Sequence, residues 1–349
     1  NALKSFDLPS SLMTERAERA RAFLKAQGLG AATITPLAGD ASFRCYFRVQ
    51  EKARHAVLMD APPEHENIQS FLQLARHLRE LGYSAPEILA VDEAAGLLLL
   101  EDLGEATYIQ VLNKGDKEEP LYQLAIDLLV DLHSRPLETA APSDLPAYTD
   151  ERFLDEVLLF TDWFLPRVTG EATKEAVRKA FSALWPPLLK RAREVPETLV
   201  LRDYHAGNLL FMPKRKGICA CGLLDFQDAV RGPITYDIVS LLEDARRNIA
   251  PDLVKRMKQR YLAEFPDLDE QAFARSIAIL GAQRHCKVLG IFTRLFQRDE
   301  KPAYLSHLPR VWRLLETNLT EPALKPLSVW LDANVPAFVR KTPPEAFSS

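Results

Sequence analysis

The chain has 349 residues, of which 47% are hydrophobic and 26% are charged, a composition typical of globular proteins. This length corresponds to about two domains of average size. The 44 basic and 48 acidic residues give a formal net charge of -4, so the chain has no overall positive field that would attract nucleic acid. These numbers favour a two-part globular protein and argue against nucleic-acid binding as its main activity.

Neither the apolar segments nor the cysteines indicate a membrane or extracellular protein. Uninterrupted apolar stretches such as 97–100 and 277–280 are far shorter than the roughly 18 to 20 residues that cross a bilayer. No secretory signal pattern opens the sequence, so we expect the cytoplasm. Four cysteines do not make a disulfide framework, and the C-x-C spacing of Cys219 and Cys221 is not that of a zinc site.

The first hundred residues alternate between helical and extended patterns. Helical spacing of apolar residues predicts helices over 11–28 and 68–81, each ending at a glycine. Short extended runs predict strands at 34–37, 45–49, 56–59, 87–91 and 97–100. The first two strands are joined by a turn at 38–42. This order predicts a small antiparallel sheet with helices.

Most of the remaining chain has helical periodicity. The predicted helices are 122–133, 153–164, 176–193, 251–265 and 271–296, with a strand-rich segment between 199 and 226. We therefore predict an α+β fold with two lobes, a small N-terminal lobe over residues 1–102 and a larger, mainly helical lobe over 103–349. A cleft between two lobes is the usual place for a ligand.

The strongest chemical signal is the pattern R-D-x-x-x-x-N at Arg202 to Asn208, followed by an apolar strand that ends at Asp225. Phosphoryl transfer needs one carboxylate that deprotonates the attacking hydroxyl, here Asp203. It also needs oxygen ligands that hold Mg²⁺ against the nucleotide phosphates, here Asn208 and Asp225. The alternative is a local turn network of Asp203, His205 and Asn208.

The loop L-R-D-Y-H-A-G-N at 201–208 resembles the H-G-D-x-H-x-x-N loop of the aminoglycoside phosphotransferase/choline kinase family, with Leu201 and Arg202 in place of His-Gly. The resemblance covers residues 30 to 300. It implies a two-lobed protein-kinase-like fold and the use of ATP and Mg²⁺. It also implies that Asp203 is the catalytic base, that His205 orders the loop, and that Asn208 and Asp225 are the metal ligands.

Other parts of the family pattern give further expectations. After a Gly-Pro turn, Asp237 follows Tyr236, and we expect Asp237 to brace a loop or cap a helix. The residues after the strand at 97–100 resemble the family's hinge, whose backbone would bind adenine; these are Glu101, Asp102 and Leu103. The turn before the second strand carries Ser42 and Arg44, and we expect it to contribute to nucleotide binding.

The third strand departs from the kinase pattern, because Met59 stands near the position of the expected phosphate-binding lysine. Arg44 and Arg48 on the preceding strand are candidates to replace that lysine. Their possible ion-pair partners are Glu64 and Glu66.

Four strings resemble one subgroup of the family, the bacterial anomeric kinases of N-acetylmuramate and N-acetylglucosamine in cell-wall recycling. They lie at 38–44, 58–64, 225–229 and 287–292. This resemblance implies an amino-sugar substrate and transfer of phosphate to its anomeric hydroxyl. Within it, Gln227 and Asp228 would bind sugar hydroxyls or brace the loop.

The predicted helix over 271–296 and the two residues after it contain five basic and no acidic residues. At about 100° per residue, Arg284, Lys287, Arg294 and Arg298 share one stripe. A basic stripe suits an anionic substrate, so Arg284 or Arg294 is a candidate to bind the substrate carboxylate. The alternative is a solvated helix face.

Two other functions stay open. A related kinase acting on choline, an aminoglycoside or a hydroxylated amino acid would differ only in its acceptor pocket. The second alternative is a nucleotide-binding pseudokinase, which the missing lysine on the third strand suggests. We expect a monomer that binds a small amino sugar and neither a membrane nor nucleic acid.

Overall fold

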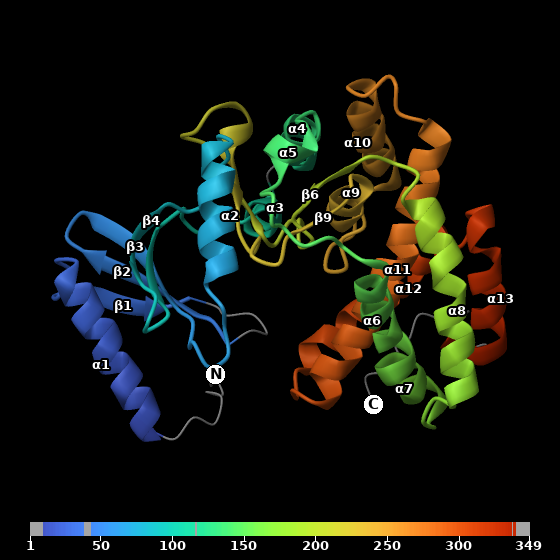
Figure 1. The fold of residues 1–349 in the computed structure, drawn as a ribbon, viewed down its shortest axis with the longest axis horizontal. Helices are drawn as coiled ribbons and strands as arrows, with labels where there is room; N and C mark the ends of the chain where they lie inside the picture. Colours follow the sequence, from blue (N-terminus) through green and yellow to red (C-terminus); the bar gives the residue numbers. More distant parts are fainter. Residues whose placement is uncertain (1–9, 38–42, 116, 337, 340–349) are drawn as a thin grey trace. The chain divides into compact units, whose positions relative to one another are not determined.

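The computed structural model describes residues 10–37, 43–115, 117–336 and 338–339. The chain forms two compact units (Figure 1). Unit 1 comprises Asn1–Ala106 and Leu210–Gln227, and unit 2 comprises Thr107–Leu209 and Asp228–Ser349. The sequence-based division between residues 102 and 103 does not include the return of 210–227 to the first unit.

Unit 1 contains a five-stranded sheet in which every neighbouring pair is antiparallel. Its order is β1 (Thr33–Pro36), β2 (Cys45–Glu51), β3 (Arg54–Asp60), β5 (Leu97–Glu101) and β4 (Ile88–Asp92). All five predicted strands are confirmed to within a few residues. The inner strand β5 is apolar and buried at four consecutive positions, as a strand covered on both faces requires.

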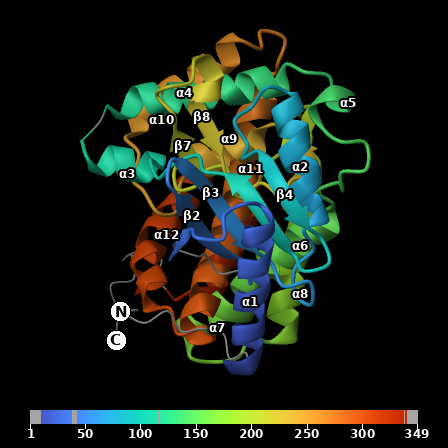
Figure 2. The same ribbon diagram turned by 90° about the vertical axis from the view of Figure 1, so that its left-hand side faces the viewer.

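Two helices accompany this sheet. Helix α1 (Ser10–Ala26) lies along it (Figure 2), and its Phe23 and Leu24 share a buried cluster with Leu58 of β3 and Leu99 of β5. Helix α2 (Gln69–Glu80) buries Phe71 and four other apolar side chains. The same apolar spacing that predicts these helices therefore forms the core of unit 1.

The segment 210–227 belongs to unit 1 because of specific contacts with that unit. It contains most of β7 (Leu209–Phe211), the short helix η2 (Gly217–Ala220) and β8 (Cys221–Leu223), and β7 pairs with β8. Ser84 forms a parallel bridge with Gly222, and Arg215 donates to the Ser84 hydroxyl over 2.7 Å. Phe226 stacks on Phe71 of α2.

Unit 2 is mainly helical. Strands β6 (Glu197–Val200) and β9 (Val230–Pro233) form one antiparallel pair. The helices are α3 (Tyr108–Asn113), α4 (Glu118–His133), α5 (Leu137–Ala140), α6 (Asp150–Leu159), the π-helix η1 (Phe160–Phe164), α7 (Leu165–Thr169), α8 (Glu175–Ala192), α9 (Thr235–Leu242), α10 (Pro251–Ala263), α11 (Glu270–Gln297), η3 (Pro302–His307), α12 (Leu308–Asn318), η4 (Pro322–Leu324) and α13 (Lys325–Asn334).

The 28-residue helix α11 forms the centre of unit 2, where α6, η1, α8, α9 and α12 pack around it. Aromatic side chains fill the surrounding core, among them Trp185 and Trp312. The predicted α+β fold, with a small antiparallel sheet and a mainly helical remainder, is confirmed. Among the described residues, none of the helices combines the length and the hydrophobicity that a membrane span needs.

Candidate active site

The loop that follows β6 carries the predicted catalytic motif. The Asn208 side-chain amide donates to the Asp203 carbonyl over 3.0 Å, and the Asn208 backbone N–H donates to the His205 carbonyl over 2.8 Å. These bonds return Asn208 to the side of Asp203, as the five-residue spacing predicts. The same bonds would form if Asp203, His205 and Asn208 made only a local turn network, so the loop geometry fits both a catalytic and a purely structural role.

Asp237 braces this loop from α9. Its two carboxylate oxygens accept the backbone N–H groups of Leu201 over 2.6 Å and of Arg202 over 2.9 Å. The residue before α9 is Ile234, so Asp237 is not the helix cap. Burial raises the pKa of Asp237 to about 7 despite these hydrogen bonds. Of the two expected roles, the structure supports loop bracing.

The backbone of Arg202 has a conformation that is rare for residues with a side chain. Its φ is 68°, in the left-handed region where glycine is favoured. Glycine, which the family pattern that this loop resembles has at this position, adopts such a φ without strain. In this chain an arginine stands at this position. Its guanidinium pairs with Glu156 of α6 and donates to the Asp228 carbonyl.

Asp203 lies among positive charges. Arg284 of α11 places Nη2 3.7 Å from Asp203 Oδ1, and the Asp203 side chain keeps 38% of its surface exposed. Burial would raise the pKa of Asp203, but the charges of Arg284 and Lys287 outweigh it and lower the pKa to about 2. Asp203 is therefore a carboxylate at neutral pH and can accept a proton.

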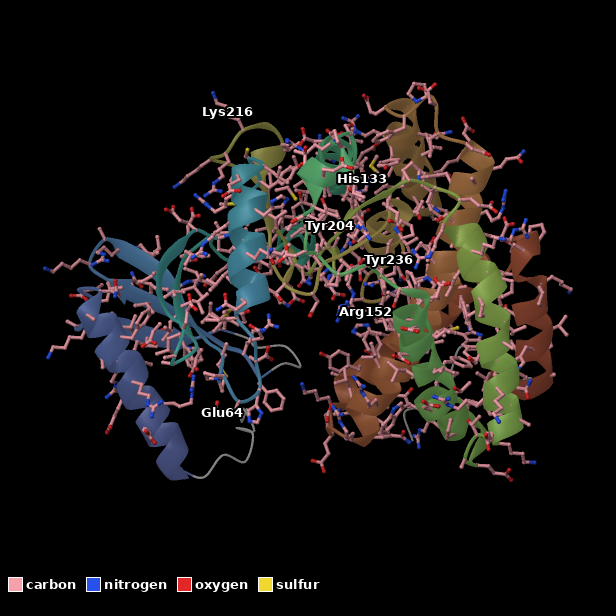
Figure 3. The ribbon with its side chains drawn as sticks, viewed as in Figure 1. Glu64, His133, Arg152, Tyr204, Lys216 and Tyr236 are labelled. Carbon is pink, nitrogen blue, oxygen red and sulfur yellow. The ribbon has the colours of Figure 1, made fainter. Side chains whose placement is uncertain are left out.

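Two neighbours of Asp203 anchor the loop. The ring of His205 accepts the Gly207 N–H at Nδ1 over 3.1 Å, and burial lowers the pKa of His205, so the imidazole is neutral. Tyr204 donates its hydroxyl to the Ala125 carbonyl of α4 over 2.7 Å (Figure 3). The His205 contact is the loop-ordering kind that the family resemblance implies.

The basic stripe on α11 is not one solvated face. Arg284 and Lys287 are buried, whereas Arg298 is exposed and pairs with Asp299. The solvated-face alternative is therefore wrong for the first two. Arg284 donates to the Arg202 carbonyl over 3.1 Å, so its guanidinium holds the loop that carries Asp203. Arg294 is half-buried, ten residues or about 15 Å further along the helix.

In unit 1, Arg44 and Glu66 form an ion pair, with Arg44 Nε 2.9 Å from Glu66 Oε2. Glu66, rather than Glu64, is therefore the partner of Arg44. Arg48 pairs with Asp102 over 2.7 Å and also with Glu105, so its charge is neutralised within the unit. Ser42 lies outside the described residues.

The side chains of the predicted hinge are engaged within unit 1. Glu101 pairs with Arg79 and Arg215, and its N–H donates to the Glu87 carbonyl over 2.8 Å. The Asp102 carboxylate accepts the Gly104 N–H over 2.8 Å. The Glu101 N–H is thus already used, and adenine binding by the remaining backbone groups up to Leu103 stays a prediction.

Asp225 also has a left-handed backbone, with φ 58°. Gln227 donates to Asp225 Oδ1 over 2.8 Å, which supports the bracing role for Gln227, while the Asp228 side chain is exposed. Asp225 belongs to unit 1, whereas Asp203 and Asn208 belong to unit 2. The described residues contain no group of three or more His, Cys, Asp or Glu side chains that could hold a metal.

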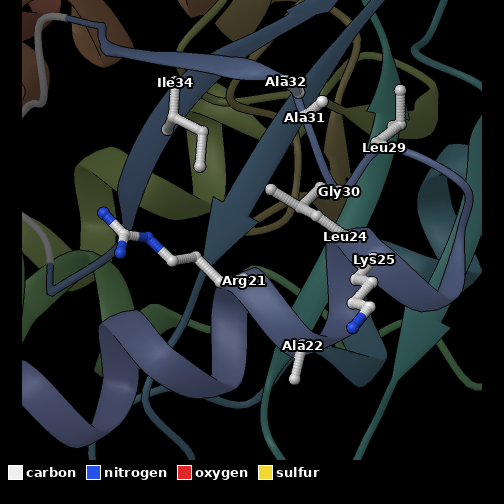
Figure 4. A pocket seen from close by; sticks show the side chains of 9 residues that line it. All are labelled: Arg21, Ala22, Leu24, Lys25, Leu29, Gly30, Ala31, Ala32 and Ile34. Carbon is white, nitrogen blue, oxygen red and sulfur yellow. The ribbon is translucent and has the colours of Figure 1, made fainter.

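A hollow in the surface of unit 1 lies beside α1, and it is lined by residues between Arg21 and Ile34 (Figure 4). Its lining combines the side chains of Arg21 and Lys25 with apolar groups such as Leu24. It contains none of the predicted site residues. We therefore assign the chemistry to the motif residues and not to this hollow.

Comparison with known proteins agrees with the loop geometry. The sequence pattern of the phosphotransferase enzyme family matches residues 33–273. The N-acetylmuramate/N-acetylglucosamine kinase of Caulobacter vibrioides is 35% identical over 363 residues, which cover 95% of this chain and all of that protein. The kinase of the same name from Pseudomonas aeruginosa is 37% identical, over 82% of this chain and 83% of that protein.

Solved structures share the fold at low sequence identity. The choline kinase LicA from Streptococcus pneumoniae has a TM-score of 0.59 and 14% identity, and the match covers 88% of this chain and 99% of that one. An aminoglycoside phosphotransferase, APH(2'')-IIa in complex with gentamicin, has a TM-score of 0.59 and 15% identity, over 86% and 98% of the two chains. With a family pattern that spans most of its length and a kinase-like loop at Asp203, this chain belongs to the phosphotransferase enzyme family.

Proposed function

We propose that this protein transfers the γ-phosphoryl group of ATP to the anomeric hydroxyl of N-acetylmuramate and N-acetylglucosamine, as a cytoplasmic monomer. The observation that carries the proposal is the ionised Asp203 on a braced loop beside Arg284. Four relatives named N-acetylmuramate/N-acetylglucosamine kinase, at 35–38% identity over 79–95% of the chain, support the choice of acceptor.

Asp203 acts on the acceptor hydroxyl. Its carboxylate accepts the hydroxyl proton while the anomeric oxygen forms a bond to the γ-phosphorus and the bond from that phosphorus to the β-phosphate oxygen breaks. The products are the sugar 1-phosphate and ADP. An anomeric hydroxyl is more acidic than an ordinary alcohol, so a carboxylate with a low pKa is a sufficient base.

Asn208 and Asp225 are our proposed Mg²⁺ ligands. Amide and carboxylate oxygens are the donors that Mg²⁺ prefers, and Mg²⁺ needs only one or two protein ligands because it keeps waters and phosphate oxygens. The ion would neutralise charge on the β- and γ-phosphates. The left-handed backbone of Asp225 supports a functional demand at this position, because such strain is concentrated at functional sites.

For the missing lysine, we propose that Arg44 binds the nucleotide phosphates. Protein kinases pair a lysine on the third strand with a glutamate on the following helix. Here the cation Arg44 lies directly before β2, and its partner Glu66 lies three residues before α2, so a comparable ion pair forms beside a strand and a helix of the sheet unit. Ser42, two residues before Arg44 in the sequence, and the backbone from Glu101 to Leu103 complete the proposed nucleotide site.

The test is Mg²⁺-dependent ADP release with N-acetylmuramate, N-acetylglucosamine, choline and kanamycin as separate acceptors. We expect turnover with the two amino sugars and a product that no longer reacts as a reducing sugar. Asp203→Asn should lower kcat by about 10²- to 10⁴-fold while ATP binding is unchanged. Turnover of choline or kanamycin but of neither amino sugar would show that the proposed acceptor is wrong. ATP binding without turnover of any acceptor would favour the pseudokinase.

A further inference from the structure

We propose that Arg152 binds the carboxylate of the acceptor and so determines how well N-acetylmuramate is used relative to N-acetylglucosamine. The inference rests on the proposed function, because these two sugars differ by the lactyl ether that carries the carboxylate. The residues that support it all belong to unit 2 and lie near Tyr148 or its hydrogen-bond partner Glu156.

The ring of Tyr148 connects Arg152 to the catalytic loop. The guanidinium carbon of Arg202, the residue before the base, lies 5.4 Å from the centre of this ring. The guanidinium carbon of Arg152 lies 5.8 Å from the same ring centre. Tyr148 is itself fixed, since it stacks on Phe153 with 3.8 Å between ring centres and donates its hydroxyl to Glu156. Arg152 and Arg202, the residue before Asp203, therefore contact the same fixed ring.

The cations near Glu156 and Asp203 already have anionic partners. Glu156 is shared between Arg202 and Lys287, whose Nζ lies 3.0 Å from Glu156 Oε1. Arg284 lies beside Asp203. Arg152 differs, because no carboxylate or other hydrogen-bond acceptor of its guanidinium is found in the described part of the chain, and its one assigned side-chain contact is the Tyr148 ring.

The local charge balance also favours an anionic ligand. The ion pairs of Arg202, Lys287 and Arg284 use the carboxylates of Glu156 and Asp203, and Asp237 is a third carboxylate near Arg284, with a pKa raised to about 7. Burial would raise the pKa of Glu156, but Lys287 and Arg202 outweigh it and lower the pKa, so Glu156 and Asp203 are ionised. The four cations, Arg152 among them, exceed these two carboxylates, and they still exceed them when Asp237 is counted as a third.

The position of Arg152 in its helix adds an independent argument. Arg152 is the third residue of α6, and a cation in the first turn opposes the helix dipole. Figure 3 labels Arg152 at this end of α6. A guanidinium binds a carboxylate through two parallel N–H bonds, which gives it both the charge and the geometry to select a lactyl group over a hydroxyl. Arg152 is therefore placed for substrate selection rather than for helix stability.

The experiment measures kcat/KM for N-acetylmuramate, N-acetylglucosamine and 3-O-methyl-N-acetylglucosamine, which has an ether at the lactyl position and no carboxylate. In Arg152→Gln we expect the ratio of N-acetylmuramate to N-acetylglucosamine to fall about 10- to 100-fold, mainly through KM. Arg152→Lys, which keeps the charge, should recover part of the loss. Arg178→Gln is the matched control, because Arg178 lies elsewhere on unit 2 and pairs with Asp162.

The possible outcomes separate this inference from the function on which it rests. If the unaltered protein uses neither amino sugar, the proposed function fails and the inference fails with it. If both sugars are used and Arg152→Gln leaves their ratio unchanged, or lowers kcat/KM equally for both, the inference alone is wrong. An equal loss with the 3-O-methyl sugar would show that Arg152 responds to bulk and not to charge, which also overturns it.

Discussion

The guanidinium of Arg44 and the carboxylate of Glu66 form a 2.9 Å ion pair in which the two side chains are only 11% and 13% exposed. The pair holds a cation directly before β2, whereas the neighbouring strand β3 has Met59 near the position of the expected phosphate-binding lysine. A half-exposed arginine without a partner would have many rotamers, whereas this one is fixed before any phosphate arrives.

We expect Arg44→Ala to raise the KM for ATP about tenfold or more, because a charge-assisted contact to phosphate is lost. Arg44→Lys should lose less, since the charge remains but the two-pronged geometry does not. Glu66→Gln should raise the KM for ATP by a smaller factor. Arg19→Ala, which removes an exposed pair with Glu15 on α1, is the control. An unchanged KM in Arg44→Ala would assign phosphate binding to another residue.

Arg284 should control the pH at which Asp203 becomes protonated. Removing a positive charge 3.7 Å away raises the pKa of Asp203, so the acid limb of kcat/KM should move to higher pH in Arg284→Gln, by about one unit. Arg284→Lys keeps the charge and should keep the limb near its original position. The profile is recorded with N-acetylglucosamine, which has no carboxylate of its own. An acid limb that does not move in Arg284→Gln would contradict the assignment.

Asp237 should make the stability of unit 2 depend on pH. Its pKa is raised from 3.8 to about 7 in the folded chain, so the folded state binds more protons than the unfolded state between these values. The contribution of Asp237 is therefore present below about pH 4 and is lost as the pH rises to 7. Melting temperatures of the unaltered protein and Asp237→Asn from pH 4 to 8 test this.

The Asp237→Asn variant should lose this part of the pH dependence, so the advantage of the unaltered protein over it should shrink as the pH rises. A difference in melting temperature that is constant across the range would refute the assignment. The same variant should also loosen the loop, because an amide offers one acceptor oxygen where the carboxylate offers two for Leu201 and Arg202.

The left-handed backbone of Arg202 gives a stability comparison between two truncations. Arg202→Gly and Arg202→Ala both remove the ion pair with Glu156, but only glycine adopts φ 68° without strain. We expect the free energy of unfolding, measured in urea, to be about 1 kcal/mol higher for the glycine variant than for the alanine variant. Equal free energies would mean that the loop relaxes when the side chain is removed.

Periodic patterns in the sequence predict most of the fold. The strands of unit 1 are short extended runs, continuously apolar in β5, the long helices of unit 2 have apolar residues at every third and fourth position, and the structure contains both. The loop at Asp203 is predicted as well, because its spacing is local. Both depend on residues close together in the chain, which is why a single sequence suffices.

Contacts between distant residues could not be predicted in this way. Nothing near Ser84 indicates that Arg215, 131 positions later, donates to it. Helical periodicity places Arg284 on a stripe of α11 but does not reveal that the stripe is buried against the loop at Arg202. The one signal in the sequence is the absence of acidic neighbours along that helix, which requires any partner to come from elsewhere.

The return of 210–227 to unit 1 has a consequence for the newly made chain. A ribosome releases residues 1–106 first, yet the partners of Ser84 and Glu101 in this unit include Arg215, which is synthesised more than a hundred residues later. The N-terminal segment 1–106, less than a third of the chain, therefore stays without these partners until nearly two-thirds of the polypeptide has been synthesised. A gene fragment that stops at residue 106 would encode the sheet without the segment that finishes it.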